Sequence, residues 1–428
     1  MKELFYEIVA EAPLAINERK PGGSQFQEGL GYIPGRVVRG ALATQVLRGC
    51  KDPAHEHNHQ ECPQPALCRG LFGEEILFGD AHPLVQKREG PFVLPATAMS
   101  CKDNSGFRSK GHGVFDTLID RACWELLQPA AMQYASRCPV CGGRTKGFSG
   151  VYSHCQIEED GRQIDYYFSE DVSRELLTRV AINRRRGVAE DELLYAINTL
   201  SQFVVVERDD PYQQKSFDPA RYVGSMRLAD DSLETLIETE LKRVTRMGGG
   251  SSRGLGRVGI HVIHAPVKPA LEERLGCFNA TLAERQQLMI RWRGDETPLP
   301  LPQYFAVTLQ SDAILSADGW QPDMRLNEAM LWRACGETGQ PPADLRLVRC
   351  YTISLTRGGF QAAWGLPKVT ELAVQAGAVF LYQMEKAADW TTRLERLEEQ
   401  GVGSRRAEGF GRVLVCDPFH YEAVKEAK

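Results

Sequence analysis

The sequence predicts an α+β protein in which one module of strands and helices occurs twice. The main observation is a stretch at 248–258, Gly-Gly-Gly-Ser-Ser-Arg-Gly-Leu-Gly-Arg-Val, which recurs at 401–413 as Gly-Val-Gly-Ser-Arg-Arg-Ala-Glu-Gly-Phe-Gly-Arg-Val. Each copy follows a charged segment with helical periodicity and precedes a short apolar run typical of a strand. The repetition indicates two copies of one unit.

The first module begins with a predicted strand at 3–10, which is short, apolar and aromatic. A helix is expected at about 36–47, because apolar residues recur there on one helical face after a Pro-Gly break. A second helix, at about 231–244, starts with a capping sequence and has one apolar face. It leads through the first glycine loop into a strand at 257–263.

The second module repeats this order. It opens with a predicted strand at 304–312 and continues with a strand at 377–382 and a short helix near 390–397. The second glycine loop then leads into an apolar strand at 413–415. Both modules therefore have the order strand, helix, strands, helix, glycine loop, strand, which predicts a ferredoxin-like (RRM-like) fold used twice in tandem.

The expected domain boundaries follow from shifts in composition. The first module covers 1–265 and carries an insertion at about 50–160, where cysteines and histidines accumulate and periodicity is weak. A connector at 266–303 ends in a proline cluster, and the second module covers 304–428.

Composition and charge limit how the chain can bind nucleic acid and where in the cell it is expected. The 428 residues carry a net charge of −5, so any nucleic acid must be bound by local basic loops. The chain has no long apolar run, and its N-terminus is acidic where a signal peptide would be basic, so we expect a cytoplasmic protein. In that reducing compartment the 12 cysteines are expected to be metal ligands or core residues.

The first glycine loop is the main candidate for binding a polyanion. Its glycines allow the backbone to turn tightly and approach a ligand, and Arg253 and Arg257 can bind phosphate oxygens. A tight helix-to-strand turn is the structural alternative, and the matching arginines of the two copies favour RNA. Arg36 and Arg39 begin a predicted helix whose N-terminal amides also favour phosphate, although this segment taken alone is better explained by a surface helix with solvated arginines.

In the second loop Glu408 lies among the arginines and would repel phosphate. This favours a role in architecture or protein contact over RNA binding for the second copy. Tyr32 and Phe410 are candidates for stacking on bases, although aromatic residues at such positions are more often part of a core.

Two kinds of cysteine pattern occur in the insertion. Cys138 and Cys141 form a Cys-x-x-Cys-Gly-Gly sequence, whose thiolates can share one tetrahedral metal ion. The alternating His55, His57 and His59, near Cys62 and Cys68, are more typical of an exposed polar loop.

Several segments resemble the RAMP superfamily of CRISPR effector proteins, and most closely its type III-D subunit that caps the guide RNA. The resemblance rests on both glycine loops, on Ile33-Pro-Gly-Arg-Val-Val-Arg-Gly-Ala-Leu and on Cys138-x-x-Cys-Gly. It also rests on Ser100-Cys-Lys, Gly111-His-Gly-Val-Phe-Asp-Thr-Leu, Ala181-Ile-Asn-Arg-Arg-Arg-Gly-Val-Ala-Glu-Asp-Glu-Leu-Leu-Tyr and Gly365-Leu-Pro-Lys. These segments span most of the chain.

The resemblance implies a non-catalytic subunit that holds the 5′ repeat-derived handle of a CRISPR RNA, beside the large polymerase-type subunit and the backbone RAMP subunits. It implies that Arg184 and Arg185 lie at the root of a protruding hairpin that touches the guide, the alternative being a solvated charge run. The candidate RNA-binding residues are then Arg36, Arg39, Arg184, Arg185, Gly248, Gly249, Gly250, Ser251, Ser252, Arg253, Arg257, Ser404, Arg405, Arg406 and Arg412.

The resemblance also completes the expected metal site. It adds Cys101 and His112 to Cys138 and Cys141 as ligands of one structural zinc ion, with Cys155 as the alternative fourth ligand.

Other functions fit the sequence less well. A guide-processing endoribonuclease of the same superfamily shares the fold, but no catalytic pair is evident, and strand alternation predicts that His261 is a half-buried packing residue. A target-cleaving backbone subunit is expected to have a single module. A nucleotide-binding enzyme would need a Gly-Lys-Ser/Thr ending and a strand-loop-helix order, which neither loop has.

Overall fold

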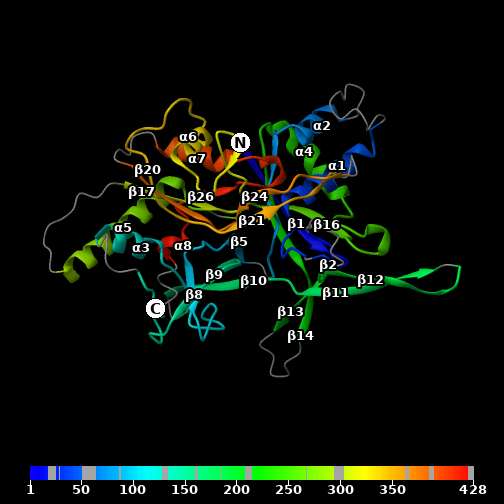
Figure 1. Ribbon diagram of the computed structural model, residues 1–428, viewed down its shortest axis with the longest axis horizontal. Coiled ribbons are helices and arrows are strands. Elements are labelled where there is room, and N and C mark those ends of the chain that lie inside the picture. The colour runs from blue at the N-terminus through cyan, green and yellow to red at the C-terminus, as the bar shows by residue number, and fades with distance from the viewer. Residues whose placement is uncertain are drawn as a thin grey trace.

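In the computed structural model the described residues are 1–17, 26–27, 29–50, 64–85, 88–127, 134–159, 162–183, 185–207, 215–266, 268–293, 303–361, 366–384 and 390–422. They form an α+β structure with several antiparallel sheets, which confirms the predicted α+β class. Two sheets carry the main cores, and the strands of the insertion at 89–93 and 145–159 lie below them in the view of Figure 1.

The first main sheet has the strand order β16-β1-β15-β3, and β4 also pairs with β15. Its strands are β1 (Lys2–Ala10), β3 (Ile76–Phe78), β4 (His82–Pro83), β15 (Arg221–Leu228) and β16 (Val258–Ile263). On β1 every second residue from Leu4 to Ala10 is buried, because successive side chains of a strand point to opposite faces. This buried face packs in one core with residues of α1 (Gly35–Leu47) and α4 (Glu234–Arg243).

The second main sheet has the strand order β20-β25-β17-β26. Its strands are β17 (Gln303–Leu309), β20 (Arg346–Tyr351), β25 (Val379–Met384) and β26 (Val413–Val415), and its helices are α6 (Glu328–Ala334) and α7 (Trp390–Gln400). When β4 is left out and the strands are numbered within their own sheets, both sets lie in the order fourth, first, third, second. The repeated glycine loops thus close two sheets of the same topology.

The segment expected to be a connector contributes to a core. It contains α5 (Leu271–Arg293), whose buried Leu271, Phe278 and Leu282 belong to the core of the second sheet. Helix α3 (Leu118–Leu127) of the insertion joins the same core. The domain boundaries given above stay a prediction.

The insertion is built of sheets rather than irregular chain. One consists of β5 (Glu89–Val93), β9 (Val151–Glu159) and β10 (Arg162–Glu170), and another of β6 (Ala98–Cys101), β7 (Val114–Asp116) and β8 (Thr145–Gly147). Two hairpins follow in the chain. One, of β11 (Arg174–Asn183) and β12 (Val188–Leu200), projects far from the body, and the other is formed by β13 (Phe203–Glu207) and β14 (Lys215–Pro219) (Figure 1).

The shorter elements complete the described structure. They are β2 (Phe26–Gln27), α2 (Pro65–Phe72), η1 (Asp231–Leu233), η2 (Ser251–Arg253), β18 (Ser316–Ala317), β19 (Gln321–Pro322), β21 (Ser354–Arg357), β22 (Phe360–Gln361), β23 (Leu366–Pro367), β24 (Glu371–Val374), η3 (Arg406–Glu408) and α8 (Phe419–Glu422). Among the described residues no helix combines the length and apolar character needed to cross a membrane.

Candidate RNA-binding loops and metal site

The first glycine loop is an exposed turn whose shape depends on glycine. Gly248, Gly250, Gly254 and Gly256 all have φ between 71° and 84°, a region that other residues rarely adopt. A Cβ atom on Gly256 would lie 2.3 Å from the carbonyl oxygen of Met247. The predicted contact residues Gly248, Gly249, Ser251, Ser252 and Arg253 are exposed, and Gly250 is half-buried.

The polar groups around this loop are held by weak surface contacts. Arg257 pairs with Glu11 at 3.2 Å, and the two side chains are 61% and 50% exposed. Such exposed pairs stabilise a protein by at most about 1 kcal/mol, so a phosphate can compete for the guanidinium. Arg246 donates to the carbonyl oxygen of Ser251 at 2.7 Å, and Arg179 of β11 donates to that of Arg253 at 3.4 Å. The loop therefore contacts the middle of the β11–β12 hairpin, where Arg179 lies close to it.

The second glycine loop has the same backbone pattern but lies at the junction of the two main sheets. Gly401, Gly403, Gly409 and Gly411 have positive φ values, and all but Gly403 are buried. Gly409 lies against Gly35 at the start of α1, where its Cβ would come within 3.2 Å of the backbone. Ser404 is exposed, and its amide donates to the carbonyl oxygen of Ile314.

The arginines of the second loop are engaged within the protein. Arg405 binds Glu371 and Glu408, both at 2.8 Å, and its guanidinium lies over the buried ring of Phe410. Although burial opposes ionisation, hydrogen bonds from Arg405 and Lys368 lower the pKa of Glu408. Glu408 is therefore the counterion of this loop. Arg406 donates to the carbonyl oxygen of Gln400 and pairs with Glu74.

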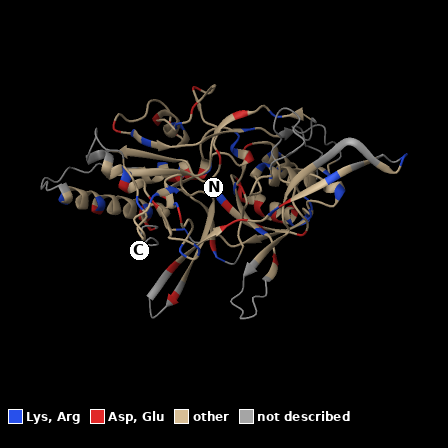
Figure 2. Ribbon diagram, turned by 60° about the horizontal axis from the view of Figure 1, so that its bottom comes forward, with Lys and Arg blue, Asp and Glu red and all other residues tan. Residues whose placement is uncertain are grey.

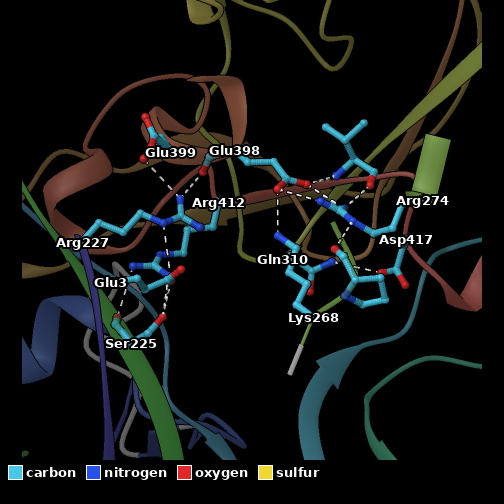
Figure 3. A network of polar contacts seen from close by, with 12 residues as sticks. Glu3, Ser225, Arg227, Lys268, Arg274, Gln310, Glu398, Glu399, Arg412 and Asp417 are labelled. Carbon is cyan, nitrogen blue, oxygen red and sulfur yellow. Dashed lines mark hydrogen bonds and ion pairs between the residues drawn. The ribbon is translucent and has the colours of Figure 1, made fainter. Parts of the chain in front are cut away.

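Arg412 crosses from the second loop to the first sheet. It donates to the carboxylate of Glu3 at 2.8 Å, the hydroxyl of Ser225 at 2.7 Å and the carbonyl oxygen of Leu77 at 3.1 Å. Figure 3 shows this cluster beside Arg227, which donates to the carbonyl oxygens of Glu398 and Glu399. Although burial opposes ionisation, Arg412 and Arg227 lower the pKa of Glu3 to about 2.

The predicted phosphate position at the start of α1 is occupied by the protein itself. The Gly35 amide donates to Asp80 Oδ1 at 2.9 Å, so a carboxylate lies where the helix favours an anion. Arg36 is half-buried, and Arg39 Nε donates to the carbonyl oxygen of Leu71 at 3.0 Å. These contacts give Arg39 a structural role. The sequence did not indicate Asp80, which is 45 residues from Gly35.

Arg185 and Arg186 lie at the tip of the β11–β12 hairpin and not at its root. Arg185 and Arg186 are exposed in the turn that joins the two strands, and Figure 2 shows basic residues at this outer end. The expected position at the root is therefore wrong for Arg185. Arg184 lies outside the described residues.

The structure brings the predicted metal ligands together. Ligand atoms of Cys101, His112, Cys138 and Cys141 all lie within 4.8 Å of one another, and Cys155 of β9 is not in this group. The Cys101 and Cys141 sulfurs are 3.7 Å apart, and Cys138 Sγ is 3.5 Å from His112 Nδ1. A hydrogen bond from the Asn104 amide lowers the pKa of the Cys101 thiol to about 7, which favours the thiolate.

Three thiols and an imidazole with this spacing fit a closed tetrahedral site, so the group can hold a metal ion such as zinc. The turn below the ligands is a compact knuckle. The Cys138 amide donates to the carbonyl oxygen of Gly143, the Gly142 amide donates to that of Cys138, and Gly142 has a φ of 69°.

The other histidines named above do not join the ligand group that the described residues form. His55, His57, His59 and Cys62 are not among the described residues, and Cys68 is buried in the first core. His261 is exposed, so its expected packing role is wrong. The reason is that the odd-numbered residues of the first part of β16 face away from the helices.

Sequence reasoning missed a buried pair between the insertion and the C-terminal helix. His420 of α8 contacts Asp116 of β7 through Nδ1 and Thr308 of β17 through Nε2. Although burial opposes protonation, Asp116 raises the pKa of His420. All three residues are buried, so the pair ties the insertion to the second sheet.

Comparison with known families gives one match. A model described as the RAMP superfamily matches residues 22–259, more than half of the chain. No curated protein matches the sequence.

Similar solved structures share little sequence with the chain. A chain of the type III-B Cmr-beta complex bound to cognate target RNA and AMPPnP, determined by cryo-EM, is 10% identical with a TM-score of 0.40, over 92% of each chain. A chain of a second Cmr-beta structure, bound to cognate target RNA, is 11% identical with a TM-score of 0.37, over 93% of this chain and 95% of that chain. A chain of a Cas6 product complex is 13% identical with a TM-score of 0.26, over 50% of this chain and 82% of that chain.

Proposed function

Because the chain belongs to the RAMP superfamily, we propose that it is a non-catalytic RNA-binding subunit of a type III CRISPR effector, close to type III-D, which holds the 5′ repeat-derived handle of the CRISPR RNA. The observation that carries this proposal is the difference between the two glycine loops. The first presents Arg253 and Arg257 on an exposed surface, whereas the second directs its arginines to Glu3, Glu371 and other groups of the protein.

The first loop suits a sugar-phosphate backbone. Its exposed backbone and the hydroxyls of Ser251 and Ser252 offer hydrogen bonds, and the arginines supply the charge that single-stranded RNA requires. The hairpin that contacts this loop through Arg179 also carries the exposed Arg185 and Arg186 at its tip. A strand bound by the loop can thus continue along the hairpin.

Binding without cleavage is part of the proposal. RNA cleavage by acid–base chemistry needs a titrating group that reaches the 2′-hydroxyl. The pair of His420 and Asp116 has the right residue types but is buried between the insertion and the second sheet. Incubation of the pure chain with repeat RNA separates the two functions, because specific cleavage without added metal would identify a guide-processing endoribonuclease.

The proposed partners are the large polymerase-type subunit and the backbone RAMP subunits of the effector. In this assembly zinc would hold the knuckle of the insertion as a structural ion, with Cys101, His112, Cys138 and Cys141 as its ligands. The insertion would then be a rigid surface for a neighbouring subunit.

The test is to express the chain with its effector neighbours and a CRISPR array, purify the complex, and sequence the retained RNA. The proposal predicts that the retained RNA begins with repeat sequence. A complex that retains no RNA, or RNA of random origin, would contradict it.

A further inference from the structure

The metal site of the insertion carries a basic surface of its own. The two segments that supply its ligands, 101–112 and 134–150, contain six lysines and arginines and one acidic residue, Asp103. All six cationic residues are exposed, and together they are called the knuckle surface: Lys102, Arg108, Lys110, Arg137, Arg144 and Lys146. Because the whole chain has a net charge of −5, this positive charge is a local feature and not a property of the chain.

The backbone places three of these cations next to one another. Arg137 and Arg144 lie opposite each other in an antiparallel bridge. On the other side of Arg144, β6 and β8 continue their pairing, and the Lys102 amide donates to the Arg144 carbonyl oxygen at 2.9 Å. Residues opposite each other across antiparallel strands point to the same face, where like charges repel. Three neighbouring cations on one face therefore favour an anion as their partner.

The fold gives these three cations no counterion among the residues that the structure describes, because the ion pairs of the described insertion involve other residues. The metal ligands hold the cations from both segments. Lys102 directly follows Cys101, and Arg137 directly precedes Cys138. A metal ion bound by the four ligands would fix both segments, and a preorganised surface loses less conformational entropy on binding. The metal site therefore assembles cations from two distant segments on one surface.

The first glycine loop has the same arrangement of arginines. There Arg246 and Arg257 lie opposite each other in an antiparallel bridge, and both are exposed. The knuckle surface is a separate site, because β8 lies apart from the β11–β12 hairpin that the first loop contacts (Figure 1). The chain therefore has two basic surfaces that are built on opposed arginines.

The composition of the knuckle surface favours a polynucleotide over a protein as the ligand. Protein interfaces depend on a few buried apolar or aromatic anchors. The one exposed large apolar side chain of the two segments is Val140. Polynucleotides, in contrast, are bound largely through their phosphate oxygens by lysine and arginine, without apolar anchors. Arg137 and Arg144 can each bind a phosphate with two parallel hydrogen bonds, and Lys102 supplies a further positive charge.

We propose that the knuckle surface binds the phosphate backbone of a polynucleotide, as a second site in addition to the first glycine loop. The inference goes beyond the proposed function, which places the handle on the first loop and gives the knuckle a structural ion alone. The contact takes the backbone of RNA or DNA, because phosphate is common to both, and it does not read the bases.

The test measures the affinity of the full-length chain for a uridine homopolymer RNA, the matching thymidine homopolymer DNA and polyglutamate at several salt concentrations. Every protein carries Arg253→Ala with Arg257→Ala, which removes the arginines of the first loop. The knuckle variant adds Lys102→Gln, Arg137→Gln and Arg144→Gln. Its slope of log RNA affinity against log salt should fall by about 2, because each lost phosphate contact removes about 0.7. An equal fall for DNA supports a contact with the backbone alone, and a fall for one polymer only supports the site and identifies that polymer as its ligand.

The matched control combines Arg333→Gln, Arg346→Gln and Arg396→Gln, which remove the same charge from three exposed arginines of the second module. The control should keep the slope of its parent protein. Zinc content and melting temperature equal to those of the parent establish that the knuckle variant is folded, since all four metal ligands remain.

Equal slopes in the knuckle variant and the control would overturn the inference. So would binding of polyglutamate that the knuckle variant loses, because the surface would then take an acidic protein segment. Failure of the proposed function looks different. The assembled complex would then retain no RNA or RNA of random origin, whereas the knuckle surface would still bind the homopolymers.

Discussion

Arg412, the last arginine of the second glycine loop, donates a hydrogen bond to the carboxylate of Glu3 on the first strand, 409 residues earlier in the chain. The corresponding arginine of the first loop, Arg257, pairs with Glu11 in solvent. One repeated sequence therefore serves two purposes. The second copy joins the two main sheets, and the first keeps Arg253 and Arg257 exposed.

Glu3→Gln should lower the free energy of unfolding by about 2 kcal/mol, because Arg412 and Arg227 would lose a partly buried anionic partner. Glu11→Gln is the matched control and should cost less than about 1 kcal/mol, because its pair is exposed. Urea unfolding of both variants measures the difference. Equal losses of unfolding free energy in the two variants would show that the ion pairs of Arg412 and Arg257 contribute equally to stability.

Asp80→Asn should increase the free energy of unfolding relative to wild type, and this advantage should grow as the pH increases. Burial raises the folded pKa of Asp80 from 3.8 to about 7. The protonated Asp80 is therefore compatible with the fold at low pH. The free energy of unfolding of the wild type falls between about pH 4 and pH 7, because the unfolded chain releases this proton at lower pH than the folded chain. Asparagine stays neutral and can still accept from the Gly35 amide. Urea unfolding at pH 5 and pH 8 should show a larger advantage for the variant at pH 8. Parallel curves for the two proteins would contradict the assigned environment.

Elemental analysis should find about one zinc ion per purified chain, because one closed four-ligand site is present among the described residues. Cys138→Ser should lose the ion and lower the melting temperature, since metal binding contributes to folding. Cys155→Ser is the control and should keep both. A metal-free wild-type chain whose Cys101, Cys138 and Cys141 react freely with alkylating reagents would exclude the site.

Local sequence patterns predicted the features that depend on nearby residues. The two glycine loops indicated the α+β class and the order of elements, because backbone turns are set by the glycines themselves. The Cys138 and Cys141 pair indicated a metal knuckle for the same reason, since both thiols belong to one turn.

Features that depend on distant residues could not be read from the sequence. Nothing near Arg405 or Arg412 shows that Glu371 and Glu3 will bind them, and nothing near Gly35 shows that Asp80 will accept from its amide. Glu408 indicated from the sequence that the second loop would differ from the first, but the distant partners of Arg405 and Arg412 could not be predicted. Likewise, nothing in the sequence of α5, which lies within the predicted connector, shows that Phe278 and Leu282 are buried in the core of the second sheet.

The most direct test of the central claim is the salt dependence of RNA affinity in the double variant Arg253→Ala with Arg257→Ala. Each lost phosphate contact should reduce the slope of log affinity against log salt by about 0.7, as for other single strands, and should weaken binding at low salt. Arg346→Ala, which removes an exposed arginine of β20, is the control and should leave the slope unchanged. A double variant with the wild-type slope would contradict the account, because the first loop would then not hold the RNA.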